Sequence, residues 1–143
     1  LILFGGGLAL AGLLDQNGLA GAIGAGMEGI AHLPIFALML LIGAVIVYVG
    51  ELASNTAMAA IFIPIAGAVA VSLGVDPVAF MMPVALTASV GFMLPVATPP
   101  NAIVFANPAV TRAAMLRAGA PLDVIGIVLS VGLGWLLVPL LLG

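Results

Sequence analysis

Cysteine and lysine are absent from this chain, and charged residues of any kind are scarce. The 143 residues include two Arg, five Asp or Glu and one His, and the formal net charge is -3. Without cysteine, the chain cannot form disulfides or zinc-thiolate sites, and it has no cysteine nucleophile. Two cations are too few to neutralise several phosphates or to form a polybasic lipid anchor, so nucleic acid is excluded as a partner.

Apolar residues take the place of the missing charges. Hydrophobic types make up 65% of the chain, charged types only 5%, and the mean hydropathy is +1.47. A soluble domain usually carries about a quarter charged residues, so a water-facing surface cannot be built from this composition. The composition predicts an integral membrane protein whose main solvent is lipid.

Enzyme chemistry is not expected. A serine nucleophile needs an activating base, and the only histidine, His32, belongs to a different segment from Ser54. A lone histidine does not make a metal centre, so we interpret His32 as an interfacial side chain. No cofactor is predicted.

Polar residues and helix breakers divide the chain into six segments, since a spanning helix needs about 20 apolar residues. Because the first residue is Leu1 and not Met, we interpret the chain as part of a longer polypeptide. The predicted segments of this all-α membrane fold are a truncated transmembrane helix at 1–14, a polar connector or interfacial helix at 15–33, two hairpin arms with a Ser-Asn-Thr tip at 34–73, a helix at 77–106 broken at Thr98–Asn101, an amphipathic interfacial helix at 107–119, and a C-terminal transmembrane helix at 121–142.

Capping chemistry sets the first boundaries. Asp76 can accept hydrogen bonds from free amides, and Pro77 loses nothing at a first helical position, so a helix is predicted to begin there. We expect that helix to run to about Val96. It should break at Pro99 and Pro100, because two consecutive prolines delete two amide donors.

Asn107 and Pro108 combine a capping residue with a proline, as Asp76 and Pro77 do, and so predict the start of the next helix. Gly119 predicts its end. This short helix carries both cations of the chain, Arg112 and Arg117. The positive-inside rule therefore places it on the cytoplasmic face.

The first polar motif, Ser54-Asn55-Thr56, lies between two long apolar arms. If the arms form a hairpin, its tip joins one helix C-terminus to one helix N-terminus. The amides near Thr56 would then attract a carboxylate, and the carbonyls near Gly50 and Ala53 would suit a cation. The motif could equally be a surface loop joining two full spans, since an arm of 17 residues measures about 25 Å.

The second motif, Ala97-Thr98-Pro99-Pro100-Asn101, offers the same chemistry by another route. Prolines leave carbonyls of the preceding turn without amide partners, and these oxygens, with the side chains of Thr98 and Asn101, suit a small cation such as Na⁺. An ordinary turn outside the membrane is the alternative. Two interrupted apolar segments are typical of the midplane binding site of a secondary transporter.

Glu51 is the only charged residue beside either motif. It could be a proton site or a cation ligand. We favour a structural role, in which it caps the hairpin end or pairs with a neighbour, because an unpaired charge inside a membrane is costly.

Four stretches together resemble one family. Residues Leu3–Leu10, Glu51–Ala57, Phe92–Phe105 and Leu116–Gly119 are similar in order and spacing to the C-terminal repeat of the divalent anion/sodium symporters. The resemblance covers essentially the whole chain, and its most specific part is the Thr-Pro-Pro-Asn-Ala-Ile-Val-Phe block. It implies a carrier of two inverted repeats, each with a re-entrant helical hairpin and an unwound transmembrane helix. The first repeat and its own Ser-Asn-Thr would be missing here.

The resemblance also implies roles for particular residues. Ser54, Asn55 and Thr56 at the tip, with Thr98 and Pro99 in the unwound helix, would contact a substrate carboxylate. Na⁺, the coupling ion, would lie between the carbonyls of Gly50, Ala53 and Ala97 and the Asn55 side chain. Gly50 departs from the family, which often has a hydroxyl residue there.

The function implied is Na⁺-coupled symport of C4-dicarboxylates such as succinate or malate, by a homodimer in a bacterial inner membrane. On this interpretation the chain alone does not transport. The alternatives are a related permease or exchanger for sulfate, citrate or arsenite, and a membrane scaffold that transports nothing.

Overall fold

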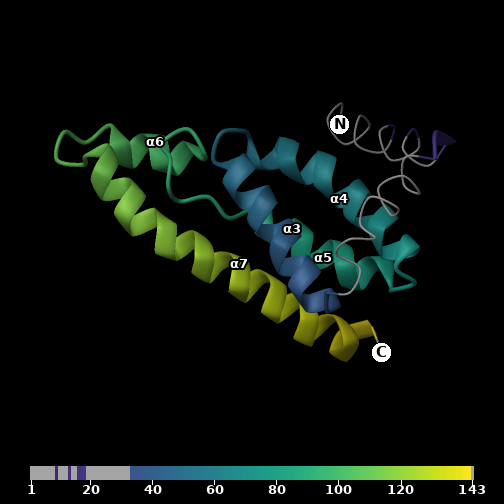
Figure 1. Cartoon of the computed structure of the whole chain (residues 1–143). Coiled ribbons are helices and arrows are strands. Elements are labelled where there is room, and N and C mark those ends of the chain that lie inside the picture. Colours follow the sequence, from purple (N-terminus) through teal and green to yellow (C-terminus); the bar gives the residue numbers. More distant parts are fainter. Residues whose placement is uncertain (1–8, 10–12, 14–15, 19–32, 143) are drawn as a thin grey trace.

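Helices make up all the regular structure in the part of the chain that the structure describes. The computed structural model describes residues 9, 13, 16–18 and 33–142. Its helices are α3 (Ile35–Gly50), α4 (Asn55–Ser72), α5 (Pro77–Thr87), α6 (Pro99–Phe105) and α7 (Arg112–Leu142) (Figure 1). The all-α prediction is confirmed over these residues. The helix predicted at 1–14 and the connector predicted at 15–33 lie almost entirely outside them.

α3 and α4 occupy the stretches expected for the two hairpin arms, and Glu51–Ser54 connects them. After α4 the chain turns at Gly74, whose φ of 67° is a left-handed value that favours glycine. Asp76 then accepts a hydrogen bond from the Ala79 amide at 2.9 Å, and Pro77 takes the first position of α5. The Asp-Pro signal therefore works as its capping chemistry predicts.

α5 is the central helix of the bundle, because it packs against α3, α4 and α7 (Figure 1). Phe80 and Val84 of α5 are fully buried, as is the hydroxyl-bearing Thr87, which satisfies its own side chain by donating to the Val84 carbonyl. The other large, fully buried apolar side chains are Leu38, Met39, Ile46, Val47, Val69 and Val131.

Glycines let α7 approach its neighbours closely. A Cβ on Gly134 would clash with the Pro83 ring of α5, and one on Gly126 would lie 2.8 Å from a Val90 methyl. At Gly119 the clash would be with backbone, at the Phe92 carbonyl and 2.6 Å from the Met93 Cα. Small residues at helix contacts are typical of membrane proteins, where close packing holds helices together.

The helix predicted from Pro77 to about Val96 ends early, at Thr87. The Ala88, Ser89 and Val90 amides still bind carbonyls of α5, and Gly91 and Pro95 lie further along the predicted segment. The amides at positions 92–94 are bound by carboxylates that lie 31 to 43 residues away in sequence. Long-range partners thus replace the intrahelical ones, and the residues between Ala88 and Thr98 are irregular.

The prolines that were expected to break a helix begin one. Thr98 is the N-cap of α6, and its hydroxyl oxygen accepts from the Asn101 amide at 3.3 Å. Pro99 and Pro100 take the first two helical positions, where no amide donor is needed. The break predicted at Thr98–Asn101 therefore lies before these residues.

The predicted division between helices at 107–119 and 121–142 is also wrong, because α7 is continuous from Arg112 to Leu142. Asn107 forms a local turn by accepting from the Ala109 amide, and Thr111 caps α7 by accepting from the Ala114 amide. Gly119 does not end the helix. Its missing side chain admits the 92–93 backbone instead.

Two of the described helices are long and apolar enough to cross a membrane, Asn55–Ser72 and Arg112–Val138, with mean hydropathies of 1.7 and 2.0. The outward residues of α7 are as apolar as the inward ones. Leu122, Ile125, Val128, Leu129 and Leu136 are all about half exposed or more. Such a helix suits lipid on its outer face.

Gly119→Ala should lower the stability of the protein in detergent by about 1 to 3 kcal/mol, because the added methyl overpacks against backbone. Gly132→Ala is the matched control, since a Cβ there meets nothing within 4 Å. Because Gly is about 1 kcal/mol worse than Ala inside a helix, Gly132→Ala should be neutral or stabilising. Thermal unfolding measures both, and equal shifts would contradict the close packing.

Candidate functional site

The two polar motifs line one cavity, although more than forty residues separate them in sequence. The cavity measures about 490 Å³. One wall is the hairpin connection and the other is the stretch that leads into α6. The lining residues are Leu52, Ala53, Ser54, Pro95, Val96, Ala97, Thr98, Pro99 and Ala102.

Two helix ends meet at the hairpin tip. α3 ends at Gly50, so its last carbonyls carry partial negative charge beside the cavity. α4 begins at Asn55 after Ser54, which adopts an extended backbone and makes no side-chain cap bond to the helix. The first amides of α4 are therefore not satisfied by that side chain, and they carry the partial positive charge of the helix N-terminus.

Asn55 carries a buried oxygen that has no partner within the described residues. Its Oδ1 atom accepts no hydrogen bond there. A Cβ built on Gly91 would lie 3.6 Å from this oxygen, and one on Gly50 would lie 3.8 Å from it. The oxygen thus lies between the end of α3 and the irregular stretch, where a cation would satisfy it. This orphaned acceptor fits a Na⁺ ligand.

The neighbouring carbonyls fit the same role. Across residues 33–142, no backbone amide or side chain donates to the carbonyls of Ala53 or Ala97. The Gly50 carbonyl accepts from the Ala53 amide at 3.0 Å, which leaves one of its two lone pairs. Hard oxygen atoms of this kind suit small cations such as Na⁺.

The predicted substrate residues are not equally placed. Ser54, Thr98 and Pro99 line the cavity, and Thr98 is half-buried with its hydroxyl engaged in the α6 cap. Thr56 is exposed and does not line it. The geometry therefore brings Ser54 of the tip together with Thr98 and Pro99 at one cavity, and it leaves Thr56 outside the lining.

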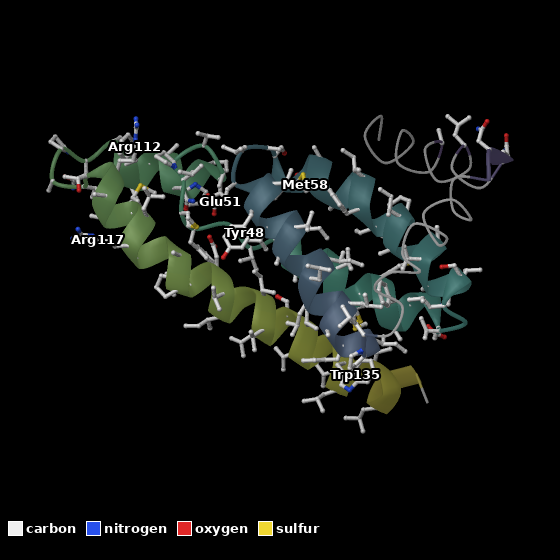
Figure 2. All side chains as sticks on the ribbon, in the orientation of Figure 1. Tyr48, Glu51, Met58, Arg112, Arg117 and Trp135 are labelled. Carbon is white, nitrogen blue, oxygen red and sulfur yellow. The ribbon has the colours of Figure 1, made fainter. Side chains whose placement is uncertain are left out.

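Glu51 holds the irregular stretch in place. Only 3% of this residue is exposed, and its carboxylate accepts from the Met93 amide at 2.8 Å and the Leu94 amide at 2.5 Å. It lies where the end of α3 approaches the N-terminal half of α7 (Figure 2). In the structure, therefore, the partners of Glu51 are backbone amides of the irregular stretch.

Asp123 is a second buried acid that the sequence analysis missed. It is fully buried on α7, its Oδ1 atom accepts from the Phe92 amide at 2.9 Å, and it neighbours the Glu51 side chain. The signal was a lone acid within an apolar stretch, since ionisable residues inside membranes are costly and rarely without a role.

Asn101 completes the support from the α6 side. Its Nδ2 atom donates to the Gly91 carbonyl at 3.0 Å and to the Leu94 carbonyl at 2.9 Å. The amide was predicted to bind a cation directly. In the structure its nitrogen instead satisfies carbonyls that no helix satisfies.

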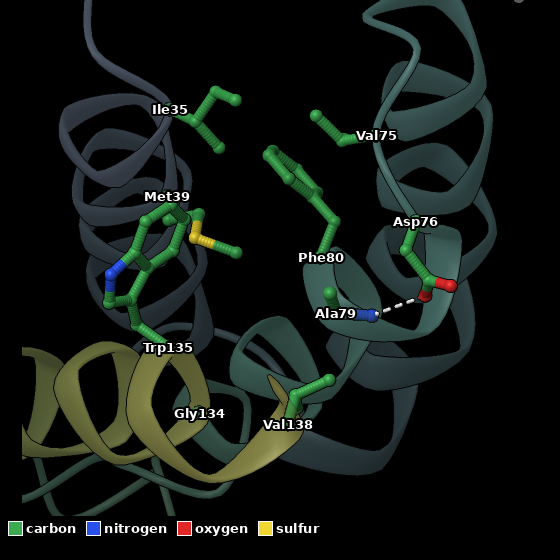
Figure 3. A pocket seen from close by; sticks show the side chains of 9 residues that line it. All are labelled: Ile35, Met39, Val75, Asp76, Ala79, Phe80, Gly134, Trp135 and Val138. Carbon is green, nitrogen blue, oxygen red and sulfur yellow. Dashed lines mark hydrogen bonds between the residues drawn. The ribbon is translucent and has the colours of Figure 1, made fainter. Parts of the chain in front are cut away.

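A second cavity, of about 350 Å³, lies at the opposite end of α3, where α5 begins and α7 ends (Figure 3). Ile35, Met39, Phe80 and Trp135 line it. Its one charged side chain, Asp76, is already occupied as the cap of α5. The cavity is apolar and offers no chemistry for an ion.

Within the described residues the regular structure is helical, and the two polar motifs meet at the first cavity. Residues 1–142 match the model of the sodium:sulfate symporter transmembrane region, and the chain belongs to this family. The resemblance to the divalent anion/sodium symporters is thereby confirmed, and the chain is an integral membrane protein of a transporter family.

Curated relatives include transporters named for dicarboxylates. The chain is 38% identical over 143 residues to the sodium-dependent dicarboxylate transporter SdcS of Staphylococcus saprophyticus, covering 100% of this chain and 28% of that protein. It is 40% identical over 127 residues to mouse solute carrier family 13 member 2, and the match covers 89% of this chain and 22% of the mouse protein. The sodium-dependent low-affinity dicarboxylate transporter 1 of Caenorhabditis elegans is 47% identical over 110 residues, and the match covers 75% of this chain and 18% of that protein. The chain thus spans about a quarter of the length of these relatives.

Asn101→Ala should destabilise the protein by about 1 to 3 kcal/mol, because it leaves two carbonyls without their donor. Asn107→Ala is the control, since Asn107 is exposed and makes one local turn bond. Thermal unfolding in detergent compares the two variants. Equal melting temperatures would show that Asn101 does not hold the irregular stretch.

Proposed function

We propose that this chain forms one half of the transport site of a Na⁺-coupled symporter for C4-dicarboxylates. The observation that carries the proposal is the meeting of the two polar motifs around one cavity, beside an orphaned Asn55 oxygen. The dicarboxylate names of SdcS and of the Caenorhabditis elegans transporter support the substrate class. The bacterial source of SdcS, whose match covers the whole of this chain, supports a bacterial plasma membrane.

Electrostatics support binding of the anion together with a cation. The residues lining the cavity include no Arg, Lys or His, so no positive side chain neutralises a carboxylate there. The N-terminus of α4 supplies only about half a unit charge. A Na⁺ ion held by Asn55, Ala53, Ala97 and Gly50 would supply a full charge beside Ser54 and Thr98. Binding of substrate would then require Na⁺, which is the basis of coupling.

The length of α3 supports a re-entrant hairpin. α3 has 16 residues, or roughly 24 Å at 1.5 Å per residue, which falls short of a hydrocarbon core of about 30 Å. A tip that ends within the membrane suits such an arm. A second Ser-Asn-Thr from an inverted repeat would face the other end of the substrate, and the homodimer remains part of this proposal.

Asn55→Ala and Thr98→Val should each weaken Na⁺-dependent succinate uptake by the complete transporter that carries this chain. Losing a bond to a charged partner costs about 1.5 to 3 kcal/mol, or about tenfold or more in half-saturation. Asn55→Ala should weaken the affinity for Na⁺ and, because Na⁺ supports succinate binding, the affinity for succinate as well. Thr98→Ser, which keeps the hydroxyl, should retain most of the affinity.

Radiolabelled uptake in proteoliposomes, with and without a Na⁺ gradient, measures these effects. Asn107→Ala is the control outside the cavity. Unchanged Na⁺ dependence in Asn55→Ala would overturn the ion site. Uptake of sulfate in place of succinate would redirect the substrate class, and uptake without Na⁺ would indicate an exchanger.

A further inference from the structure

Three successive amides of the irregular stretch are bound by two buried carboxylates. The Phe92 amide donates to Asp123, and the Met93 and Leu94 amides donate to the two oxygens of Glu51. Bonds from amides to carboxylates are roughly twice as strong as bonds between neutral groups. The Ala88, Ser89 and Val90 amides still bind carbonyls of α5, and the amides of residues 92–94 bind the two carboxylates, which stabilise the irregular conformation there.

The position of Glu51 links both walls of the cavity. It follows Gly50 at the end of α3 and precedes the tip residues Ala53 and Ser54. Its partner Leu94 is followed within a few residues by Ala97, on the other wall. One side chain therefore joins the two backbone segments whose oxygens would share the ion.

Asp123 fixes the same stretch to α7. The residue is fully buried, and while one carboxylate oxygen binds the Phe92 amide, the Oδ2 atom has no partner among residues 33–142. The Glu51 side chain is a neighbour of Asp123. One turn before Asp123, Gly119 contacts the backbone of Phe92 and Met93, so α7 seats this stretch at two points.

We propose that Glu51 and Asp123 form a carboxylate clamp that positions the 91–98 stretch against the hairpin tip and so sets the affinity for Na⁺ without touching it. The inference rests on the proposed function and extends it to residues outside the cavity. Glu51 and Asp123 are positioning residues, since neither lines the cavity. The clamp depends on hydrogen-bond acceptors that are correctly placed for the amides of residues 92–94.

Two nearly isosteric variants separate acceptor geometry from charge. Glu51→Gln keeps one acceptor and puts an NH₂ group against a second amide donor, so one clamp bond is lost. Asp123→Asn can keep its oxygen on the Phe92 amide and turn its NH₂ group toward Glu51. The clamp predicts that Glu51→Gln raises the Na⁺ half-saturation concentration about tenfold, with the uptake rate at saturating Na⁺ within about twofold of the original. For Asp123→Asn, the Na⁺ half-saturation concentration and the uptake rate at saturating Na⁺ should both stay within about twofold of the original protein.

A distance measurement tests the clamp independently of transport. Spin labels at Leu52→Cys and Val96→Cys report the separation of the two walls, since both residues line the cavity and are 74% and 66% exposed. Pulsed electron paramagnetic resonance should give a narrow distribution with Glu51 and Asp123 intact and with Asp123→Asn, and a broader one with Glu51→Gln.

An unchanged distance distribution in Glu51→Gln would overturn the clamp. So would loss of uptake in Asp123→Asn, because the charge of Asp123, or a proton on it, would then take part directly. If the intact protein shows no Na⁺-dependent uptake but Glu51→Gln still broadens the distance distribution, the proposed function and the effect on Na⁺ affinity fail, and the positioning of the 91–98 stretch by Glu51 stands.

Discussion

The bond pair from the Met93 and Leu94 amides to Glu51 is the interaction on which the rest of the site depends. Backbone that leaves a helix within lipid must find other partners, because water is absent and each unsatisfied group is costly. Glu51, Asp123 and Asn101 supply those partners from three separate helices or their ends. The irregular stretch is therefore held by long-range bonds, and Ala97 is placed opposite the hairpin tip as a result.

Scarcity of charge has two separate meanings in this molecule. On the lipid-facing surface it reflects the solvent, as the apolar outer face of α7 shows. Around the proposed site it governs release as well as binding. A buried arginine would hold a dicarboxylate tightly, whereas helix ends, neutral oxygens and a Na⁺ ion that can leave allow the anion to leave with it. The acids of the clamp bind amides of the backbone and do not line the cavity, so neither would contact the substrate directly.

The Asp76 cap was readable from the sequence because its chemistry is local. The Ser-Asn-Thr and Thr-Pro-Pro-Asn motifs were recognisable as interruptions of apolar runs, but Pro99 and Pro100 begin α6 where a helix break was predicted. The path of the irregular stretch after α5 was not readable, since its amides at positions 92–94 bind Glu51 and Asp123, which are distant in sequence. Sequence reasoning also took Gly119 for a helix end, because a glycine that admits a neighbouring backbone looks the same as one that terminates a helix. The family resemblance suggested the site residues, and the fold shows that Thr56 is exposed and does not line the shared cavity.

The central claim is that the hairpin tip and the irregular stretch form one site that Na⁺ and a dicarboxylate occupy together. Maleimide labelling of single cysteines at Leu52 and Val96, on opposite walls, tests it most directly, with Val104 on the exposed side of α6 as the reference. Na⁺ and succinate together should slow labelling at Leu52 and Val96 by about tenfold or more and leave Val104 unchanged. Equal labelling rates at all three positions, with or without Na⁺ and succinate, would contradict the account.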